Sequence, residues 1–399
     1  MDRREGVTIV GGGPVGLTAA WLLAARDVPV TVIEREDRVL PDYRASTFHP
    51  ATLDLLEHTG ITEALLDMGI KCRTLQYRTW TEGTIAEFDH AVLKDDTNYP
   101  YRLQCEQYKL AGWLRDRLAE QPGVELLYGH ELSAIEPGED NVAVSLTGPG
   151  GPHSFTTDYL IGADGGRSTI RKQLDIGFEG YTLPERILVI GTTLDLRTLL
   201  PGLANVNYVS DPVYYGHILR IPDLWRLSQP VVSDMSDEEA LSDNEIGKRL
   251  RKVLPGIELS DLKIRGIYTV HQRVAETYRK GRVFLAGDAA HLNNPKGGMG
   301  LNGGIHDAYD LTARLAKVWH GGADQAELDG YEALRRPEAV NDILRQTAQN
   351  VSNLTVSDPD ARAKLFAEWR RKAADPEAAR EMLLQTSMIA SLRRCGMLS

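Results

Sequence analysis

A glycine-rich stretch, GDAAHLNNPKGGMGLNGGIHDA at residues 287–308, contains the groups best suited to binding a ligand. It follows an apolar, strand-like run, so Asp288 stands at a strand end, where its carboxylate can accept hydrogen bonds from hydroxyl groups. A helical pattern begins near Leu301 and Asn302. The first N–H groups of a helix have no partner within the helix and carry partial positive charge. The stretch therefore predicts a ligand held close to the backbone.

A second glycine pattern, VTIVGGGPVGLTAA, lies near the N-terminus. In a dinucleotide-binding turn, Gly11 allows the tight turn, Gly13 lets a pyrophosphate reach the backbone, and Gly16 lets helix and strand pack closely. Glu34 ends the next strand, 18 residues after Gly16, where it can accept hydrogen bonds from a ribose. A glutamate here favours a ribose without a 2'-phosphate. Both FAD and NAD fit this segment.

A third pattern, DYLIGADGGRSTIRKQL, leads a strand into Asp164 and then into a helix with Arg167 and Arg171. An ordinary turn followed by a capped helix explains this pattern as well as a ligand site does.

The composition excludes several classes of protein. The 399 residues favour two packed domains, and 42% hydrophobic with 25% charged residues is typical of a globular protein. A net charge of -11 without a basic run argues against binding nucleic acid. Three distant cysteines without CxxC spacing indicate neither disulfides nor a zinc site and favour the cytoplasm. No stretch of 18 apolar residues or signal peptide is present, so we expect no membrane contact and no secretion.

The order of patterns along the chain indicates a noncontiguous layout. Nucleotide-binding segments alternate with β-rich ones, which predicts a second sheet inserted into the first domain. After Asn302 the chain is largely helical, with helices expected near Pro337–Val351 and Pro359–Ala374.

Taken in this order, the three motifs resemble those of the group A flavoprotein aromatic hydroxylases, single-component FAD monooxygenases of the para-hydroxybenzoate hydroxylase type. VHQRVAETYRKGRVFLAGDAAHLNNPKGGMGLNGGIHDAYDLTARLA and YEALRRPEA are most similar to the phenol hydroxylase and 3-(3-hydroxyphenyl)propionate hydroxylase branch. The resemblance covers Val7 to Ala339. That branch usually continues into a thioredoxin-like C-terminal domain, whereas only about sixty residues follow RRPEA here.

The resemblance implies an α/β fold: a Rossmann-like FAD-binding domain with an inserted, mainly β substrate domain and a helical C-terminal tail. We expect the FAD-binding domain at residues 1–70, 100–184 and 265–340, the substrate domain at 71–99 and 185–264, and the helical segment at 341–399. The implied cofactors are non-covalent FAD, NADPH or NADH as a transient reductant, and O2 as co-substrate.

The resemblance also assigns roles to single residues. It places Arg44 near the pyrophosphate, Gln104 against the flavin, Asp164 in a motif associated with FAD and NAD(P)H use, and Asp288 on the ribityl chain. The implied cofactor set is Gly11, Gly13, Pro14, Gly16, Glu34, Arg35, Arg44, Gln104, Asp164, Asp288, Pro295, Gly298, Gly300, Leu301 and Asn302, with no metal.

The implied reaction is hydroxylation of a phenol or hydroxylated heteroaromatic ring through a flavin C4a-hydroperoxide. Pro295 matches the family's proline whose carbonyl faces the reacting part of the substrate. Removing the phenol proton calls for a histidine or tyrosine within hydrogen-bond reach. In VYYGHILR, strand alternation puts Tyr215 and His217 on one face, which makes them the candidate catalytic side chains.

Ordinary core or surface positions remain an alternative for each of these side chains. Comparable pocket candidates are Arg78, Trp80 and Tyr101. We expect structural roles for His49 and His291. The segment HLNNPKGG, which includes Lys296, is more polar than is common in the family and predicts a polar pocket mouth.

Other functions stay open at this point. An FAD-dependent epoxidase or tailoring oxidase could act on a larger polyketide or isoprenoid with the same fold, and a non-catalytic flavin sensor could share the motifs. The expected partner is a small aromatic substrate, and the expected state is a monomer or homodimer.

Overall fold

Apolar strands that pair mostly in parallel build the core of the first sheet. A computed structural model of the chain describes residues 2–231 and 234–398, so Met1 and Ser399, at the ends of the first and last expected segments, lie outside it. Within the described residues this sheet has eight strands. In spatial order they are β17 (Arg279–Lys280), β18 (Val283–Leu285), β11 (Gly151–Gly162), β1 (Asp2–Val10), β2 (Val30–Glu34) and β8 (Val124–Tyr128), with β10 (Val142–Gly148) and β9 (Glu131–Pro137) continuing from β11.

The second sheet draws its strands from two separate stretches, residues 74–89 and 178–292. Its order is β19 (His291–Leu292), β16 (Leu262–Ala275), β12 (Phe178–Thr192), β15 (Trp225–Pro230), β14 (Gly216–Arg220), β13 (Val206–Val209), β5 (Thr74–Thr79) and β6 (Gly83–Asp89). A third, small sheet has the order β3 (Thr47–Phe48), β7 (Arg102–Gln104) and β4 (Ile70–Cys72). The boundaries of the two domains stay a prediction, because the long β12 and β16 continue across two of them.

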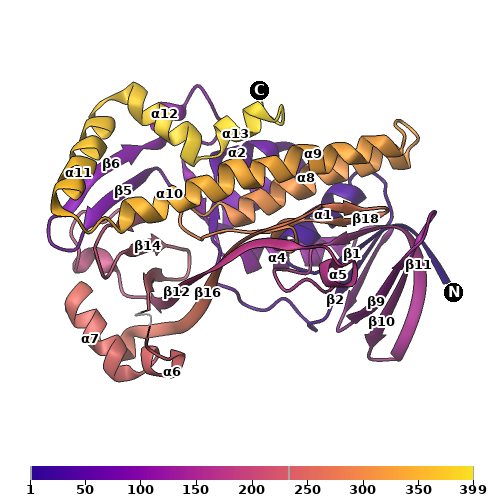
Figure 1. Cartoon of the computed structure of the whole chain (residues 1–399), viewed down its shortest axis with the longest axis horizontal. Helices are drawn as coiled ribbons and strands as arrows, with labels where there is room; N and C mark the ends of the chain where they lie inside the picture. Colours follow the sequence, from indigo (N-terminus) through magenta and orange to yellow (C-terminus); the bar gives the residue numbers. More distant parts are fainter. Residues whose placement is uncertain (1, 232–233, 399) are drawn as a thin grey trace.

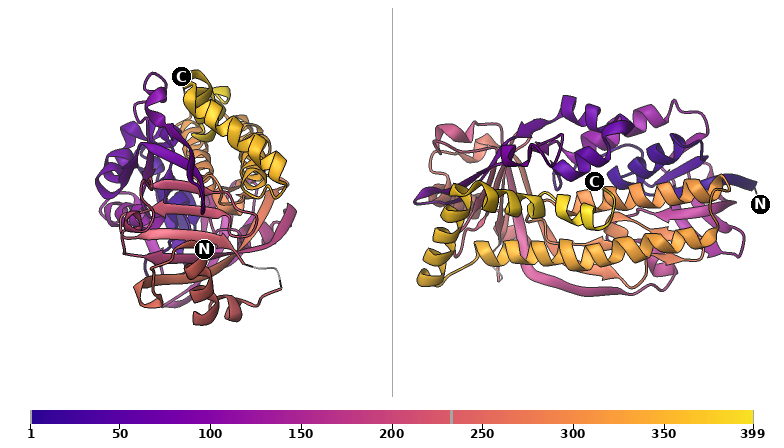
Figure 2. Two further views of the ribbon diagram at one scale, coloured as in Figure 1. Left: turned by 90° about the vertical axis from the view of Figure 1, so that its left-hand side faces the viewer. Right: turned by 90° about the horizontal axis from the view of Figure 1, so that it is seen from above.

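The helices cover the sheets and connect the two ends of the molecule (Figures 1 and 2). They are α1 (Pro14–Ala24), α2 (Pro50–Leu55), α3 (Ile61–Met68), α4 (Gln107–Leu118), α5 (Thr169–Gln173), α6 (Asp237–Ala240), α7 (Asp243–Val253), α8 (Gly300–Trp319), α9 (Asp329–Glu338), α10 (Arg345–Leu354), α11 (Pro359–Ala374), α12 (Pro376–Thr386) and α13 (Ile389–Arg394). None of the helices in the described part of the chain has the length and hydropathy to cross a bilayer.

The expected start of a helix at Pro337 is wrong. Helix α9 begins at Asp329 and contains Pro337, and a π-helical turn, Ala339–Leu344, leads directly into α10. Proline has no N–H for the helical ladder and its ring crowds the preceding turn, which a wider turn can absorb. The other expected helix is confirmed from Pro359 to Ala374, where the Asp358 side chain accepts a hydrogen bond from the Ala361 N–H at 2.8 Å.

A buried network of charges joins α8 and α9 to the turn after β18. One oxygen of the Asp307 carboxylate accepts from the Gly287 N–H at 3.1 Å and lies 2.8 Å from His291 Nε2, and the other accepts from Arg335 Nε at 2.9 Å. Arg335 also pairs with Glu338 at 2.6 Å. Burial acts to raise the pKa of Asp307, but the charges of His291 and Arg335 hold it at about 2. The turn that leads into Asp288 is therefore fixed by an ionised side chain.

Replacing Arg335 with leucine tests how much the fold depends on this network. The substitution leaves the carboxylates of Asp307 and Glu338 buried without their cation, and we expect the free energy of unfolding to fall by about 3–5 kcal/mol. Denaturant titration measures the change, with the exposed Arg371→Leu as a matched control expected to change stability by less than about 0.5 kcal/mol. Equal stabilities of the two variants would contradict a structural role for the network.

Candidate cofactor and substrate site

The first glycine turn has the geometry that a dinucleotide requires. Gly11 has a φ of +115°, and a Cβ there would lie 2.2 Å from the Ala163 carbonyl oxygen. A Cβ on Gly16 would lie 2.0 Å from the Gly11 carbonyl oxygen, so the turn and helix α1 pack too closely for any side chain. Around the Cβ position of Gly13, by contrast, the described part of the chain leaves 4 Å of open space. Pro14 begins α1, whose free N–H groups face that space.

Glu34 stands at the end of β2 with both oxygens turned toward backbone N–H groups. Oε2 accepts from the Gly12 N–H at 2.6 Å, and Oε1 accepts from the Glu36 N–H at 3.0 Å. Each carboxylate oxygen keeps a further lone pair, so a ribose hydroxyl can still donate to it. The neighbouring Arg35 side chain is 73% exposed and pairs with Glu36 at 3.3 Å. Its predicted contact with the cofactor stays a prediction, because this position does not indicate a ligand.

Asp288 follows directly after β18 and the turn at Gly287. Its side chain is exposed, yet burial among the surrounding protein atoms raises the pKa of its carboxyl, an effect that His291 and Arg44 partly offset. Both observations hold together if the carboxylate faces a cleft that is open to solvent. Arg44, whose charge acts on Asp288, forms a bidentate ion pair with Asp42. Its Nε lies 3.0 and 3.1 Å from the two carboxylate oxygens, and its Nη2 lies 2.7 Å from one of them. These residues fit a ligand with both hydroxyl and phosphate groups.

The Asp164 motif caps a helix and also leaves one oxygen free. Oδ2 of Asp164 accepts from the N–H groups of Thr169 at 2.7 Å and Ile170 at 3.2 Å, as an ordinary cap would. Oδ1 is buried and has no hydrogen-bond partner among the described residues. Arg171 donates to the carbonyl of Ala289 at 2.9 Å and so ties this motif to the turn that contains Asp288. An unpaired buried oxygen at this place fits a cofactor hydroxyl.

The side chain of Asn302 holds the glycine loop instead of facing a ligand. Its oxygen accepts from the His49 N–H at 2.9 Å and the Thr52 hydroxyl at 2.6 Å. Its amide donates to the carbonyls of Thr47 at 2.8 Å and Gly298 at 2.7 Å. Since these four bonds use the amide group fully, only the backbone N–H groups at the start of α8 remain available to a ligand.

Gln104, predicted to contact the flavin, is the last residue of β7 and is fully buried opposite Thr47 of β3. Its Nε2 donates to the Thr47 hydroxyl at 2.9 Å, and its Oε1 accepts from the Ser46 hydroxyl at 3.0 Å. In this arrangement the glutamine positions β3, which in turn contacts the loop. The remaining members of the expected set, Gly300 and Leu301, lie in the first turn of α8.

The loop between Asp288 and α8 is held from several sides. The Pro295 carbonyl accepts from the Gly298 N–H at 3.0 Å, and the Gly297 carbonyl lies 2.8 Å from Nε2 of the buried His49, a contact that fits the expected structural role of His49. From the C-terminal segment, Asn350 on α10 donates to the Lys296 carbonyl at 2.9 Å. Sequence reasoning missed both this clamp and Asp307. A polar residue at an otherwise buried helical position is the signal that could have marked Asp307.

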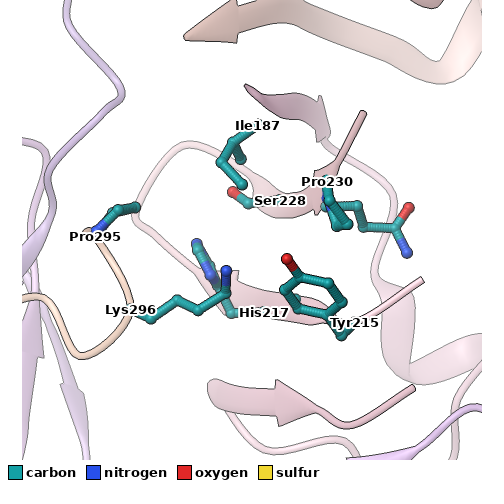
Figure 3. A pocket seen from close by; sticks show the side chains of 9 residues that line it. Ile187, Tyr215, His217, Ser228, Pro230, Pro295 and Lys296 are labelled. Atoms are coloured by element: carbon teal, nitrogen blue, oxygen red, sulfur yellow. The ribbon is translucent and has the colours of Figure 1, made fainter. Parts of the chain in front are cut away.

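Beside this loop lies a narrow pocket against the second sheet (Figure 3). It brings Tyr215 and His217 together on one face, as strand alternation predicts. Burial, together with the nearby charges of Arg226 and Lys296, lowers the pKa of His217 well below its ordinary value. The lining comprises Ile187, Tyr215, Gly216, His217, Ser228, Gln229, Pro230, Pro295 and Lys296.

Tyr215 is not free to take a proton from a ligand as it stands. Its hydroxyl donates to the carboxylate of Glu185, and burial, followed by this carboxylate, raises the pKa of the tyrosine. The other pocket candidates are absent from the described lining of this pocket. Arg78 is buried and donates to Gln76 at 3.2 Å, while Trp80 donates to the Tyr214 carbonyl at 2.9 Å. Tyr101 is partly buried.

Comparisons with known proteins agree with this site. Residues 4–347 match the FAD binding domain family. The chain is 33% identical over 402 residues to the para-nitrophenol 4-monooxygenase of Pseudomonas sp. (strain WBC-3), covering 98% of each protein. It is 33% identical over 334 residues to a 3-(3-hydroxy-phenyl)propionate/3-hydroxycinnamic acid hydroxylase of Mycolicibacterium smegmatis (strain ATCC 700084 / mc(2)155), covering 84% of this chain and 58% of that protein.

A solved structure is similar over its whole length. The crystal structure of p-nitrophenol 4-monooxygenase PnpA from Pseudomonas putida DLL-E4 has 34% sequence identity and a TM-score of 0.93, covering 98% of this chain and 99% of that one. The expected resemblance and the expected α/β fold with a helical C-terminal tail are thereby confirmed. The chain therefore belongs to the FAD binding domain family and, within it, is an FAD-dependent aromatic monooxygenase with the group A aromatic hydroxylase fold.

Proposed function

We propose that this protein hydroxylates a small phenolic or hydroxylated heteroaromatic ring, with non-covalently bound FAD, NADPH or NADH as reductant and O2 as co-substrate. The observation that carries the proposal is the position of the loop at residues 293–298. It follows the exposed Asp288 in the chain, leads into α8, and contributes Pro295 and Lys296 to the lining of the pocket that contains Tyr215 and His217. A cofactor and a ring bound on the two sides of this loop would meet at Pro295.

The residues of the first sheet would hold the cofactor. The open space above Gly13 at the start of α1 suits the pyrophosphate, Glu34 suits the adenosine ribose, and Asp288 suits the ribityl hydroxyls. The free N–H groups at the start of α8 would stabilise negative charge on the reduced ring system. When bound, FAD supplies the hydride acceptance and the oxygen chemistry that no side chain can provide.

The residues of the second sheet would hold the substrate. Because His217 is neutral, its unprotonated ring nitrogen can accept a hydrogen bond from a phenol hydroxyl and orient the ring. The Pro295 carbonyl accepts one hydrogen bond, from Gly298, so its second lone pair is free to accept one from a substrate hydroxyl. The narrow pocket also excludes water from the reacting atoms, which strengthens these polar contacts.

The similarity to a known protein favours a small ring over a polyketide or isoprenoid. The relative that matches over 98% of both proteins is named for a nitrophenol. The three cysteines are all free, which fits the reducing cytoplasm that we propose as the location. The oligomeric state, monomer or homodimer, stays a prediction.

Asp288→Ala tests the cofactor assignment. Loss of a charge-assisted hydrogen bond to a ribityl hydroxyl should weaken FAD binding about 10- to 100-fold while changing the affinity for aromatic ligands much less. Quenching of flavin fluorescence during titration of the apoprotein measures the dissociation constant. The exposed Asp67→Ala on α3 removes the same charge elsewhere and should bind FAD as the wild type does. Equal FAD affinity in all three proteins would refute the assignment.

The reaction itself can be tested with purified protein. We expect it to be yellow, and we expect phenols, pyridinols or quinolones to accelerate its oxidation of NADPH or NADH, with mass spectrometry showing a product heavier by one oxygen atom. Hydrogen peroxide release distinguishes uncoupled turnover from hydroxylation. A protein that cannot be reconstituted with FAD, or that consumes no O2 with any of these rings, would rule the proposal out.

A further inference from the structure

Lys296 is a buried cation in the pocket wall that has no hydrogen-bond or ion-pair partner among the described residues. Its side chain is nearly inaccessible, at 2% exposure for the residue, and its Nζ finds no hydrogen-bond partner within the described ranges. Figure 3 shows the side chain extending from the loop toward Tyr215 and His217. Nζ lies 4.4 Å from the centre of the Tyr215 ring. An ammonium group buried in this way is costly unless an anion joins it.

Among the described residues Lys296 forms no ion pair. Glu185 acts on it electrostatically, but the carboxylate of Glu185 already accepts the hydrogen bond from Tyr215. His217 is neutral, and Arg226 on β15, which donates to the Tyr43 carbonyl, adds a second positive charge to this part of the sheet. The pocket therefore has an excess of positive charge and hydrogen-bond donors.

The backbone of Lys296 is fixed in place. Its N–H donates to the Asn294 side chain at 3.0 Å, and its carbonyl accepts from Asn350 at 2.9 Å. These two bonds hold the backbone of Lys296 beside Pro295. Burial of the side chain and its contact with the Tyr215 ring then keep the ammonium inside the pocket wall, where it is preorganised for a ligand.

We propose that Lys296 binds an anionic oxygen of the aromatic substrate, so that the enzyme selects rings bearing a phenolate or a carboxylate over their neutral counterparts. This inference rests on the proposed function, since it names the substrate class of the same pocket. Lys296 replaces the solvent around the anion, and the neutral His217 can hydrogen-bond a second polar group of the ring.

The proposal has a pH dependence of defined sign. Burial lowers the pKa of Lys296 to about 8, with Glu185 opposing the shift. The lysine is charged below that pH and neutral above it. Affinity for a phenolate should therefore rise as the phenol ionises and fall again as the pH passes about 8. His217 stays neutral throughout this range and adds no transition.

Ligand binding to the FAD-loaded protein tests the proposal. We would titrate wild type, Lys296→Met and the exposed Lys263→Met on β16 with two probe pairs, recording the change in flavin absorbance. The first pair is 4-nitrophenol and 4-nitroanisole, which differ in a phenolate. The second is benzoate and benzamide, which differ in a carboxylate. Lys263→Met removes an equal charge outside the pocket and should behave as the wild type does.

We expect Lys296→Met to bind the anionic member of at least one pair about 10- to 100-fold more weakly, with little change for the neutral member and for FAD. Which pair responds identifies the anion as a phenolate or a carboxylate. The fall in affinity above pH 8 should also disappear. If the ratio of the two dissociation constants, anionic over neutral, were the same in Lys296→Met and wild type for both pairs, the proposal would be overturned, whatever the effect on FAD affinity. If no ring perturbs the wild-type flavin, the proposed function itself fails.

Discussion

The carboxylate of Asp307 is the constraint on which the rest of the site depends. It is fully buried, and its two oxygens bind the Gly287 N–H, His291 and Arg335. Gly287 has a φ of +60° and directly precedes Asp288, so this bond fixes the direction in which the Asp288 carboxylate leaves the strand. A buried charge with fixed partners tolerates little displacement, since losing any one of them leaves charge unpaired. The turn is thereby rigid before any ligand arrives.

The same network explains why distant segments contribute to one site. Through Arg335 it reaches α9, and through Glu338 it reaches Ser391 in α13, which donates to that carboxylate at 3.2 Å. Asn350 in α10 then clamps the loop at Lys296. The C-terminal helices, which lie along the second sheet and α8 in Figures 1 and 2, thus support the loop between the cofactor and substrate sides. The π-helical turn after Pro337 joins α9 and α10 into one continuous helix, so that the same helix contributes both Arg335 to the network and Asn350 to the loop.

Local rules were enough to predict the fold and the glycine turns. Gly11 and Gly16 are required by contacts of about 2 Å that belong to any tight β-turn-α unit, so their spacing alone identifies them. Asp288 followed from its position at a strand end. Asn302 and Gln104 could not be judged in this way, because their amides are used by Thr47, which is distant in sequence from both. Pairing of that kind leaves no periodic signal. The helix near Pro337–Val351 was predicted, but its start was misplaced, because a wider turn overrides the usual effect of proline.

A crystal structure of the FAD-loaded protein with a bound aromatic acid or phenol tests the central claim most directly. That claim is that the loop at residues 293–298 lies where a flavin meets an anion-selecting substrate pocket. The account predicts the ribityl chain on Asp288, the pyrimidine edge of the flavin at the start of α8, and an anionic oxygen of the ring within hydrogen-bond distance of Lys296 Nζ. A flavin bound elsewhere, or a ring whose anionic group faces away from Lys296, would contradict it.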